Sequence, residues 1–237
     1  MFRKLLHKTS ELDPPSILLQ ILENQPRTAH YVETGTFLTP LMLAITNNKR
    51  AHEKHGKNYE EVIQKLLDNG VYPDAVNSLD QSAIILAIYS MNYSMNPFAM
   101  LISAGADVHT VYEDRCLPMT ILIECSNPEF VIQSIEMLIG KGADLNRVSQ
   151  DGFNPFFEAA LDDECSMEVL HFLLSKGCDF FTETDTFDFF CDEGSEAYTC
   201  VNRWPLIMCV IVTQEIGMYN LIDLGVWNLL FDLTSQE

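Results

Sequence analysis

A short motif recurs five times along this chain of 237 residues, and it limits the fold more than any other feature. Each copy has two apolar residues, two variable residues and a glycine, and the copies end at Gly70, Gly105, Gly142, Gly177 and Gly225. The glycines are 35, 37, 35 and 48 residues apart, and periods of about 20–50 residues are typical of repeat proteins. The spacing therefore predicts stacked units, each of which buries its apolar side against its neighbours.

The residues around each glycine predict two short helices per unit. Twelve residues after Gly70, Gly105 and Gly142 come the apolar openings "SAIILAI", "LPMTILI" and "NPFFEAA". Prolines favour the first helical turn in four units, at Pro40, Pro118, Pro155 and Pro205. Thr39 and Asn154 are N-cap residues by type, and the glycine suits the left-handed end of the second helix. Between each glycine and the next helix we expect a hairpin-like finger, with turns near Asp80, Asp114 and Gly152.

These residues resemble the ankyrin repeat, in which a Thr-Pro-Leu-His-x-Ala opening is followed by Leu-Leu-x-x-Gly-Ala-Asp. The resemblance covers roughly residues 34–230 and implies an all-α ankyrin-repeat solenoid of stacked helix pairs with projecting hairpin or loop fingers. Residues 1–33 are then an N-terminal helical cap, with a helix near 16–25, and 34–237 are the array. The expected repeats are about 34–76, 77–111, 112–148, 149–198 and 199–237.

Several segments depart from this pattern. Ala83 stands where the family has proline and Leu117 where it has threonine, so these helix starts are expected to be less stable. The polar stretch "NNKRAHEKHGKNYE" lengthens the link between the first two helices and predicts a surface loop. The two histidines of "HEKH" belong to that loop.

An acidic aromatic insertion at residues 181–199 is the largest departure. Seven acidic residues lie between Asp179 and Glu196 without a lysine or arginine, and phenylalanines alternate with them. Two interpretations stay open. The phenylalanines pack back on the last repeats, or they form aromatic anchors inside an acidic rim that docks a basic partner.

Charge and cysteine content restrict the class of partner and the compartment. The formal net charge of −20 argues against nucleic acid and anionic membranes and favours a basic protein surface. No signal peptide is evident at the start, and the apolar windows are shorter than the roughly 18–20 residues of a membrane-spanning helix. The seven cysteines include no Cys-x-x-Cys pair, which indicates buried free thiols in a reducing cytoplasm, Cys209 among them. We expect a cytoplasmic monomer without disulfides.

Catalytic patterns do not emerge from the sequence. It contains no glycine-rich phosphate loop, no nucleophile elbow and no paired metal motif. His171 and Cys178 fit an ordinary second helix and its exit, and the carboxylates of residues 162–164 fit a solvated loop. We therefore expect no enzyme, no cofactor and no metal, with an active site inside the 181–199 insertion as the alternative.

The ankyrin resemblance implies a non-enzymatic protein–protein interaction module that binds through a concave groove and finger tips. By position, the candidate partner-binding residues are Leu79, Gln81, Tyr89, Glu113, Asp114, Glu124, Asp151, Phe153, Leu161, Asp162, Arg203 and Ile211, joined from the insertion by Asp185, Asp188, Phe189 and Phe190. The resemblance also marks Asn146 as a candidate for hydroxylation. Two settings stay open: an effector of an intracellular bacterium, acting on a host protein in the host cytoplasm, or a regulatory or inhibitory subunit of an endogenous complex.

Overall fold

A computed structural model describes ten segments of the chain, residues 14–55, 59–90, 94–109, 118–123, 125, 127–148, 153–161, 166–179, 187–189 and 198–200. The chain divides into two compact units, Met1–Ala143 and Asp144–Glu237. Helices dominate the described residues, so the expected helical class is confirmed.

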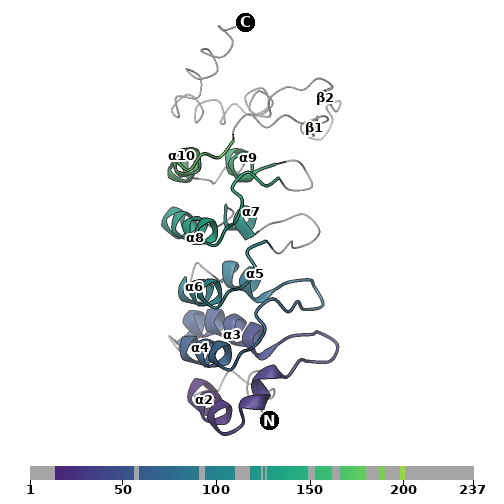
Figure 1. Ribbon diagram of the computed structural model, residues 1–237, viewed down its shortest axis with the longest axis vertical. Coiled ribbons are helices and arrows are strands. Elements are labelled where there is room, and N and C mark those ends of the chain that lie inside the picture. The colour runs from purple at the N-terminus through teal and green to yellow at the C-terminus, as the bar shows by residue number, and fades with distance from the viewer. Residues whose placement is uncertain are drawn as a thin grey trace, which may run out of the picture. The chain divides into compact units, whose positions relative to one another are not determined.

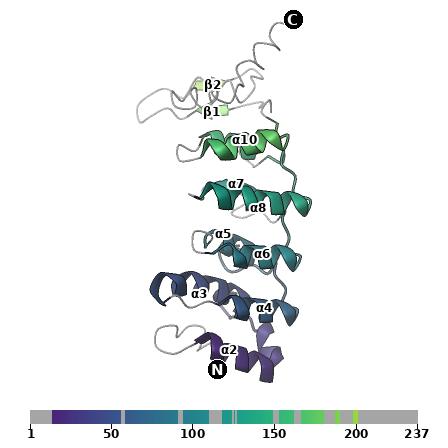
Figure 2. The same ribbon diagram turned by 90° about the vertical axis from the view of Figure 1, so that its left-hand side faces the viewer.

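The first unit is a stack of helix pairs. Its described helices are α2 (Pro14–Asn24), the 3₁₀ helix η1 (Pro26–His30), α3 (Pro40–His55), α4 (Glu60–Asp68), α5 (Ala83–Ile88), α6 (Asn96–Ser103), α7 (Pro118–Ile123) and α8 (Pro128–Gly140). Helix α3 packs against α4, α5 against α6 and α7 against α8. Contacts between layers join α3 to α5 to α7, and α2 to α4 to α6 to α8, so the pairs lie in two parallel columns (Figure 1). Figure 2 shows the same layers from the side of α4, α6 and α8.

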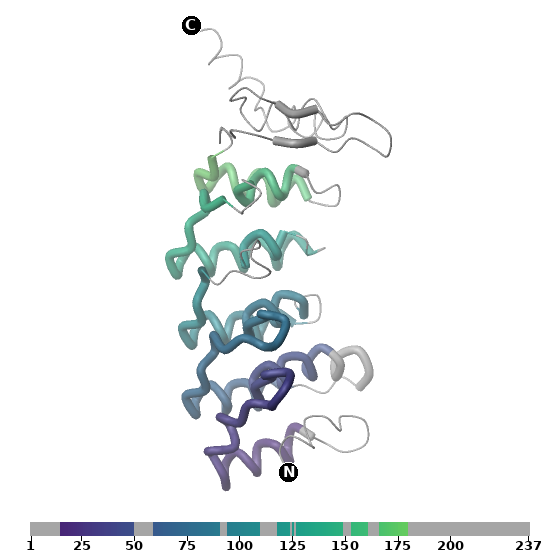
Figure 3. The backbone as a smooth tube through the Cα atoms, turned by 90° about the vertical axis from the view of Figure 1, so that its right-hand side faces the viewer, coloured from purple at the N-terminus to yellow at the C-terminus, as the bar shows by residue number. Residues whose placement is uncertain are grey.

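Two described fingers project from this stack on one side. The first finger, residues 31–39, joins η1 to α3, and the second finger, residues 71–82, joins α4 to α5. Seen from their own side, the two fingers lie one above the other (Figure 3). The backbone N–H of Ser78 donates to the carbonyl oxygen of Thr36 at 2.9 Å, which ties the second finger to the first.

The apolar positions of the motif form the core between the layers. The leucine that opens each copy is fully buried, at Leu66, Leu101 and Leu138. Burial of such a side chain contributes about 1.5–3 kcal/mol. The first helices add their own buried residues, among them Leu41, Ile45 and Ile85, so each layer covers the apolar side of the next.

Each described second helix ends in the predicted left-handed glycine. The φ angles are 73°, 86°, 91° and 84° at Gly70, Gly105, Gly142 and Gly177. In all four, the N–H of the residue after the glycine donates to the carbonyl of the buried leucine five positions earlier, at 3.4, 3.0, 3.0 and 3.1 Å. This is the Schellman arrangement, which satisfies a carbonyl that the helix itself leaves free.

The described helix starts also follow the predicted residues, with one exception. Pro40, Pro118 and Pro155 each begin a helix. The side-chain oxygen of Thr39 accepts a hydrogen bond from the N–H of Met42 at 3.2 Å. Ser82 stands at the same place before α5, but its side chain makes no capping hydrogen bond and its hydroxyl is buried without a partner.

The second unit contains one helix pair and one strand pair among its described residues. Helix α9 (Pro155–Leu161) packs against α10 (Met167–Ser175). Strands β1 (Phe187–Phe189) and β2 (Tyr198–Cys200) pair in antiparallel register, with Phe187, Asp188 and Phe189 opposite Cys200, Thr199 and Tyr198. Strand β1 lies in the insertion predicted at 181–199, and β2 extends one residue beyond it to Cys200. The fifth repeat predicted at 199–237 lies outside the described residues except for the end of β2.

One predicted loop is helical instead. The stretch that begins at Asn47 was expected to leave the helix, but α3 continues to His55, so both histidines of "HEKH" are helical. The segment from Lys49 to His55 contains no glycine or proline, and its Lys, Arg, Ala and Glu residues have high helix propensity. Asn48 is buried and its side-chain oxygen accepts from the N–H of Tyr59 at 2.9 Å, which closes the link to α4. Within the described segments, no helix has both the length and the apolar character that crossing a membrane requires.

Candidate protein-binding surface

The first finger is closed by a network around Glu33. The N–H of Glu33 donates to the carbonyl of Leu38, and the N–H of Phe37 donates to the carbonyl of Glu33, both at 3.0 Å. The Thr36 hydroxyl donates to a carboxylate oxygen of Glu33 at 2.6 Å. Because Glu33 is buried and engaged in this way, its carboxylate fixes the turn and leaves residues 34–37 as the outer end of the finger.

Asn77 organises the second finger in a comparable way. Its N–H donates to the carbonyl of Gln81 at 3.0 Å, and its side-chain oxygen accepts from the N–H groups of Leu79 and Gln81 at 2.9 and 3.0 Å. The Asn77 side-chain NH₂ donates to the side-chain oxygen of Gln81 at 3.0 Å. Gln81, a predicted partner-binding residue, therefore has a structural bond inside the finger, whereas Leu79 is held at the tip.

Both fingers place a non-glycine residue in the left-handed region. Phe37 has a φ of 54° and Asp80 a φ of 55°. Each lies two residues before the N-cap position of the next helix, where the segment before Asn154 has Gly152. For an L-amino acid this conformation costs about 1–2 kcal/mol, and a bulky residue such as phenylalanine is rarely found there. The predicted turn near Asp80 is confirmed, while Asp114 and Gly152 lie outside the described residues.

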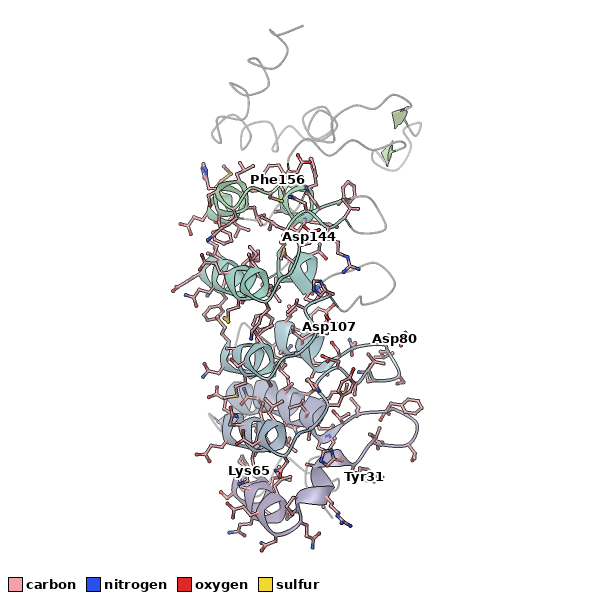
Figure 4. All side chains as sticks on the ribbon, in the orientation of Figure 1. Tyr31, Lys65, Asp80, Asp107, Asp144 and Phe156 are labelled. Atoms are coloured by element: carbon pink, nitrogen blue, oxygen red, sulfur yellow. The ribbon has the colours of Figure 1, made fainter. Side chains whose placement is uncertain are left out.

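The two fingers expose six large apolar side chains. Tyr72 stands directly after the helix end at Val71, and we call the other five the Phe37 surface. Their exposed fractions are 47% for Tyr31, 46% for Val32, 55% for Phe37, 45% for Val76 and 65% for Leu79. The Ser78–Thr36 hydrogen bond joins the two fingers next to Leu79 and Phe37. Tyr31 and Asp80 lie on the finger side of the stack, whereas Lys65 on α4 lies on the opposite side (Figure 4). Exposed aromatic and aliphatic groups gathered in this way are typical of interaction sites.

Charge on the fingers has one sign. Residues 31–39 and 71–82 contain no lysine or arginine and three acids, Glu33, Asp74 and Asp80. Glu33 is buried and Asp80 is exposed beside Leu79. A ligand of this surface therefore meets apolar groups and an exposed carboxylate.

The predicted groove residue Tyr89 lies at the other end of α5 from the second finger. It is the C-terminal cap of α5 and is 44% exposed. The side-chain amine of Lys49, on α3, donates to its carbonyl oxygen at 3.3 Å. This bond ties Tyr89 to the preceding layer and leaves its side chain partly accessible.

Equivalent side chains link successive turns after the glycines. In the first unit, a carboxylate oxygen of Asp74 accepts from the N–H of Asp107 at 2.8 Å. In the second unit, the side-chain oxygen of Asn146 accepts from the N–H of Asp179 at 2.7 Å. Both bonds span 33 residues. Asn146, the candidate for hydroxylation, is exposed and has this structural role.

Cys178 lies at the exit of the second helix α10, as predicted. It is buried, its thiol donates to the carbonyl of Leu145 at 3.4 Å, and burial raises its pKa from 9.0 to about 12. His171 is exposed on α10. Cys125 and Cys178 are both free cysteines, whereas Cys209 lies outside the described residues. In the described segments no group of three His, Cys, Asp or Glu side chains is suited to a metal ion.

The remaining predicted partner-binding residues are placed only in part. Phe153 is half-buried before α9, Leu161 ends α9, and Asp188 and Phe189 lie in β1. Nine others lie outside the described residues: Glu113, Asp114, Glu124, Asp151, Asp162, Asp185, Phe190, Arg203 and Ile211. Sequence reasoning missed Tyr31, Val32, Phe37 and Val76. The available signal was Phe37 itself, which stands two residues before Thr39 as Gly152 stands before Asn154.

No protein-family model matches the chain, and no curated protein matches its sequence. The fold and the surface therefore rest on the chain's own residues.

Proposed function

We propose that this chain is a non-enzymatic ankyrin-type repeat protein that binds another protein through its finger tips and the adjacent groove. The observation that carries the proposal is the fourfold recurrence of one helix end, in which a buried leucine, a left-handed glycine and the same backbone hydrogen bond stand together. A repeated local structure of this kind favours stacked repeats over a single irregular helical domain.

The bonds between successive turns support the same reading. Asp74 with Asp107, and Asn146 with Asp179, are each 33 residues apart, which matches the ankyrin period of about 33 residues. Each bond joins equivalent turns of neighbouring repeats within one unit.

A binding role is favoured because the fingers contribute little to the core yet are well ordered by hydrogen bonds. Their tips present apolar side chains, and hot spots of protein interfaces are enriched in aromatic residues. The protonated, buried thiol of Cys178 fits a structural role better than nucleophilic catalysis. The net charge of −20 favours a basic partner, since opposite charges accelerate association.

Capture from cell lysates tests this proposal. The full chain is immobilised beside a folded acidic protein of similar net charge, and retained proteins are quantified at low and high salt. We expect partners retained by this chain alone, less strongly at high salt. Retention from a eukaryotic lysate alone favours the effector setting, and retention from a bacterial lysate alone favours a regulatory subunit. If both columns retain the same proteins from both lysates, the binding function is wrong.

A further inference from the structure

We propose that the Phe37 surface anchors the partner, and that its occupant is a segment of a protein with an aromatic or aliphatic side chain next to a lysine or arginine. This inference rests on the proposed binding function and names the site and the chemistry of the partner. It narrows the expected site from the groove, the finger tips and the insertion to the first two fingers.

The backbone of Phe37 is the first argument. Phe37 has a φ of 54° and an exposed fraction of 55%. The exposed side chain gains little from packing within the chain, and glycine would take the same conformation without strain. Strained backbone conformations cluster at binding sites, where the surrounding structure holds them. A strained phenylalanine with an exposed ring is therefore explained by a contact that the free chain does not contain.

The arrangement of the neighbouring side chains is the second argument. Tyr31 and Val32 precede the turn of the first finger, Val76 precedes the turn of the second, and Leu79 lies in that turn. The fingers are joined by the Ser78–Thr36 bond, and internal hydrogen bonds hold each turn. The surface is thus held in place before a partner arrives, which lowers the entropy lost on binding.

Charge identifies the occupant. The exposed carboxylate of Asp80 lies next to Leu79, and the fingers carry no basic residue. An apolar anchor flanked by lysine or arginine matches both features, whereas an acidic segment is repelled. A second copy of this chain brings its own net charge of −20, so self-association through this surface is disfavoured.

Selection from a phage-displayed library of random peptides tests the assignment. The bait is the full chain, and enriched peptides are then titrated against four single variants by fluorescence anisotropy. Phe37→Gly and Leu79→Ser remove anchors, Asp80→Asn removes the charge at a position where asparagine tolerates a positive φ, and Tyr72→Ser is the control. Tyr72 is a matched control because its side chain is 66% exposed but lies outside the Phe37 surface.

We expect enriched peptides to combine an apolar residue with lysine or arginine. Their affinity should fall about tenfold or more with Phe37→Gly and with Leu79→Ser. Asp80→Asn should weaken binding less and reduce its dependence on salt, and Tyr72→Ser should change nothing. The melting temperature of Phe37→Gly should equal or exceed that of the unchanged chain, which separates lost binding from unfolding.

Three results would overturn the assignment. Peptides that bind Phe37→Gly and Leu79→Ser as well as the unchanged chain would leave the binding function intact and move the site elsewhere. The proposed binding function would be wrong if the library yields no binder and if the column with this chain retains the same lysate proteins as the column with the acidic control protein. A concentration-dependent dimer in sedimentation, lost in Phe37→Gly, would make a second copy the occupant.

Discussion

The second helices of the repeats all end in the same way, whereas the first helices begin in different ways. At each described end, a buried leucine is followed by a left-handed glycine and the same hydrogen bond. At the starts, Thr39 accepts one backbone hydrogen bond, Asn154 accepts two and Ser82 accepts none. The ends depend on a conformation that glycine adopts at low cost, so they tolerate little change. A helix start can be satisfied by several side chains or by water, so it varies.

The largest loss of stability is expected from replacing the buried leucine at the end of a second helix. Leu101→Ala should lower the free energy of unfolding by about 2–5 kcal/mol, because Leu101 is fully buried between layers. Urea denaturation followed by circular dichroism measures the change. Leu79→Ala is the matched control, and since Leu79 is 65% exposed it should change stability by less than about 0.5 kcal/mol. Equal losses in the two variants would mean that the stack is not stabilised by these leucines.

The next largest loss of stability is expected at Asn154, the helix start whose side chain makes the most capping hydrogen bonds. Asn154 is fully buried, and its side-chain oxygen accepts from the N–H groups of Phe156 and Phe157, both at 3.1 Å. Its NH₂ group donates to the carbonyl of Asp179. Asn154→Ala should cost about 1–2 kcal/mol of unfolding free energy, measured in the same denaturation experiment.

Asn154→Asp separates the two roles of that side chain. The carboxylate keeps the capping oxygen but loses the NH₂ donor to Asp179. If Asn154→Asp lowers the free energy of unfolding as much as Asn154→Ala does, the stability comes from that donor. If Asn154→Asp leaves the free energy of unfolding nearly unchanged, the stability comes from the capping oxygen. Unchanged stability in both variants would contradict the importance of this start.

The sequence predicts the ends and most starts because both depend on nearby residues. A glycine after paired apolar residues favours the left-handed helix end, and a proline after Thr39 or Asn154 favours a helix start. The α3 extension to His55 was missed because the polar residues were interpreted as solvated loop, although their helix propensity is high. Phe37 was missed because its conformation contradicts its own preference. Whether Val32 and Val76 are exposed depends on the packing of neighbouring fingers, which the local sequence does not specify.

A third prediction concerns the residue after the glycine, which is Val71, Ala106, Ala143 or Cys178 at the four ends. Burial holds the pKa of Cys178 at about 12 in the folded chain, against 9.0 for an ordinary thiol. Above pH 9 the unfolded chain loses this proton while the folded chain keeps it, so stability falls as pH rises. Near about pH 10 the loss should be about 1 kcal/mol.

Cys178→Ala is the control for this pH dependence, because alanine occupies the same place at Ala106 and Ala143. Thermal unfolding of both chains between neutral and alkaline pH gives the comparison. The difference in melting temperature between them should narrow as pH rises above 9. A constant difference would mean that the thiol does not titrate as burial requires, and rapid reaction of folded Cys178 with a thiol reagent at neutral pH would contradict its burial.

The smallest effect is expected at the start of α5, where the Ser82 side chain makes no capping hydrogen bond. Ala83→Pro should stabilise the chain by about 0.4–1 kcal/mol. Ala83 is the first residue of α5, a position whose N–H has no partner inside the helix. Ser82 has a φ of −85° and a ψ of 170°, an extended conformation that a following proline favours.

Ser82→Ala is the companion variant. Alanine at an N-cap normally costs about 1 kcal/mol, but the Ser82 hydroxyl is buried without a partner, so its removal should be neutral or stabilising. Differential scanning calorimetry resolves both shifts. A lower melting temperature in Ala83→Pro would show that the α5 start differs from the starts at Pro40 and Pro155, and a loss in Ser82→Ala would show that the hydroxyl finds a partner in solution.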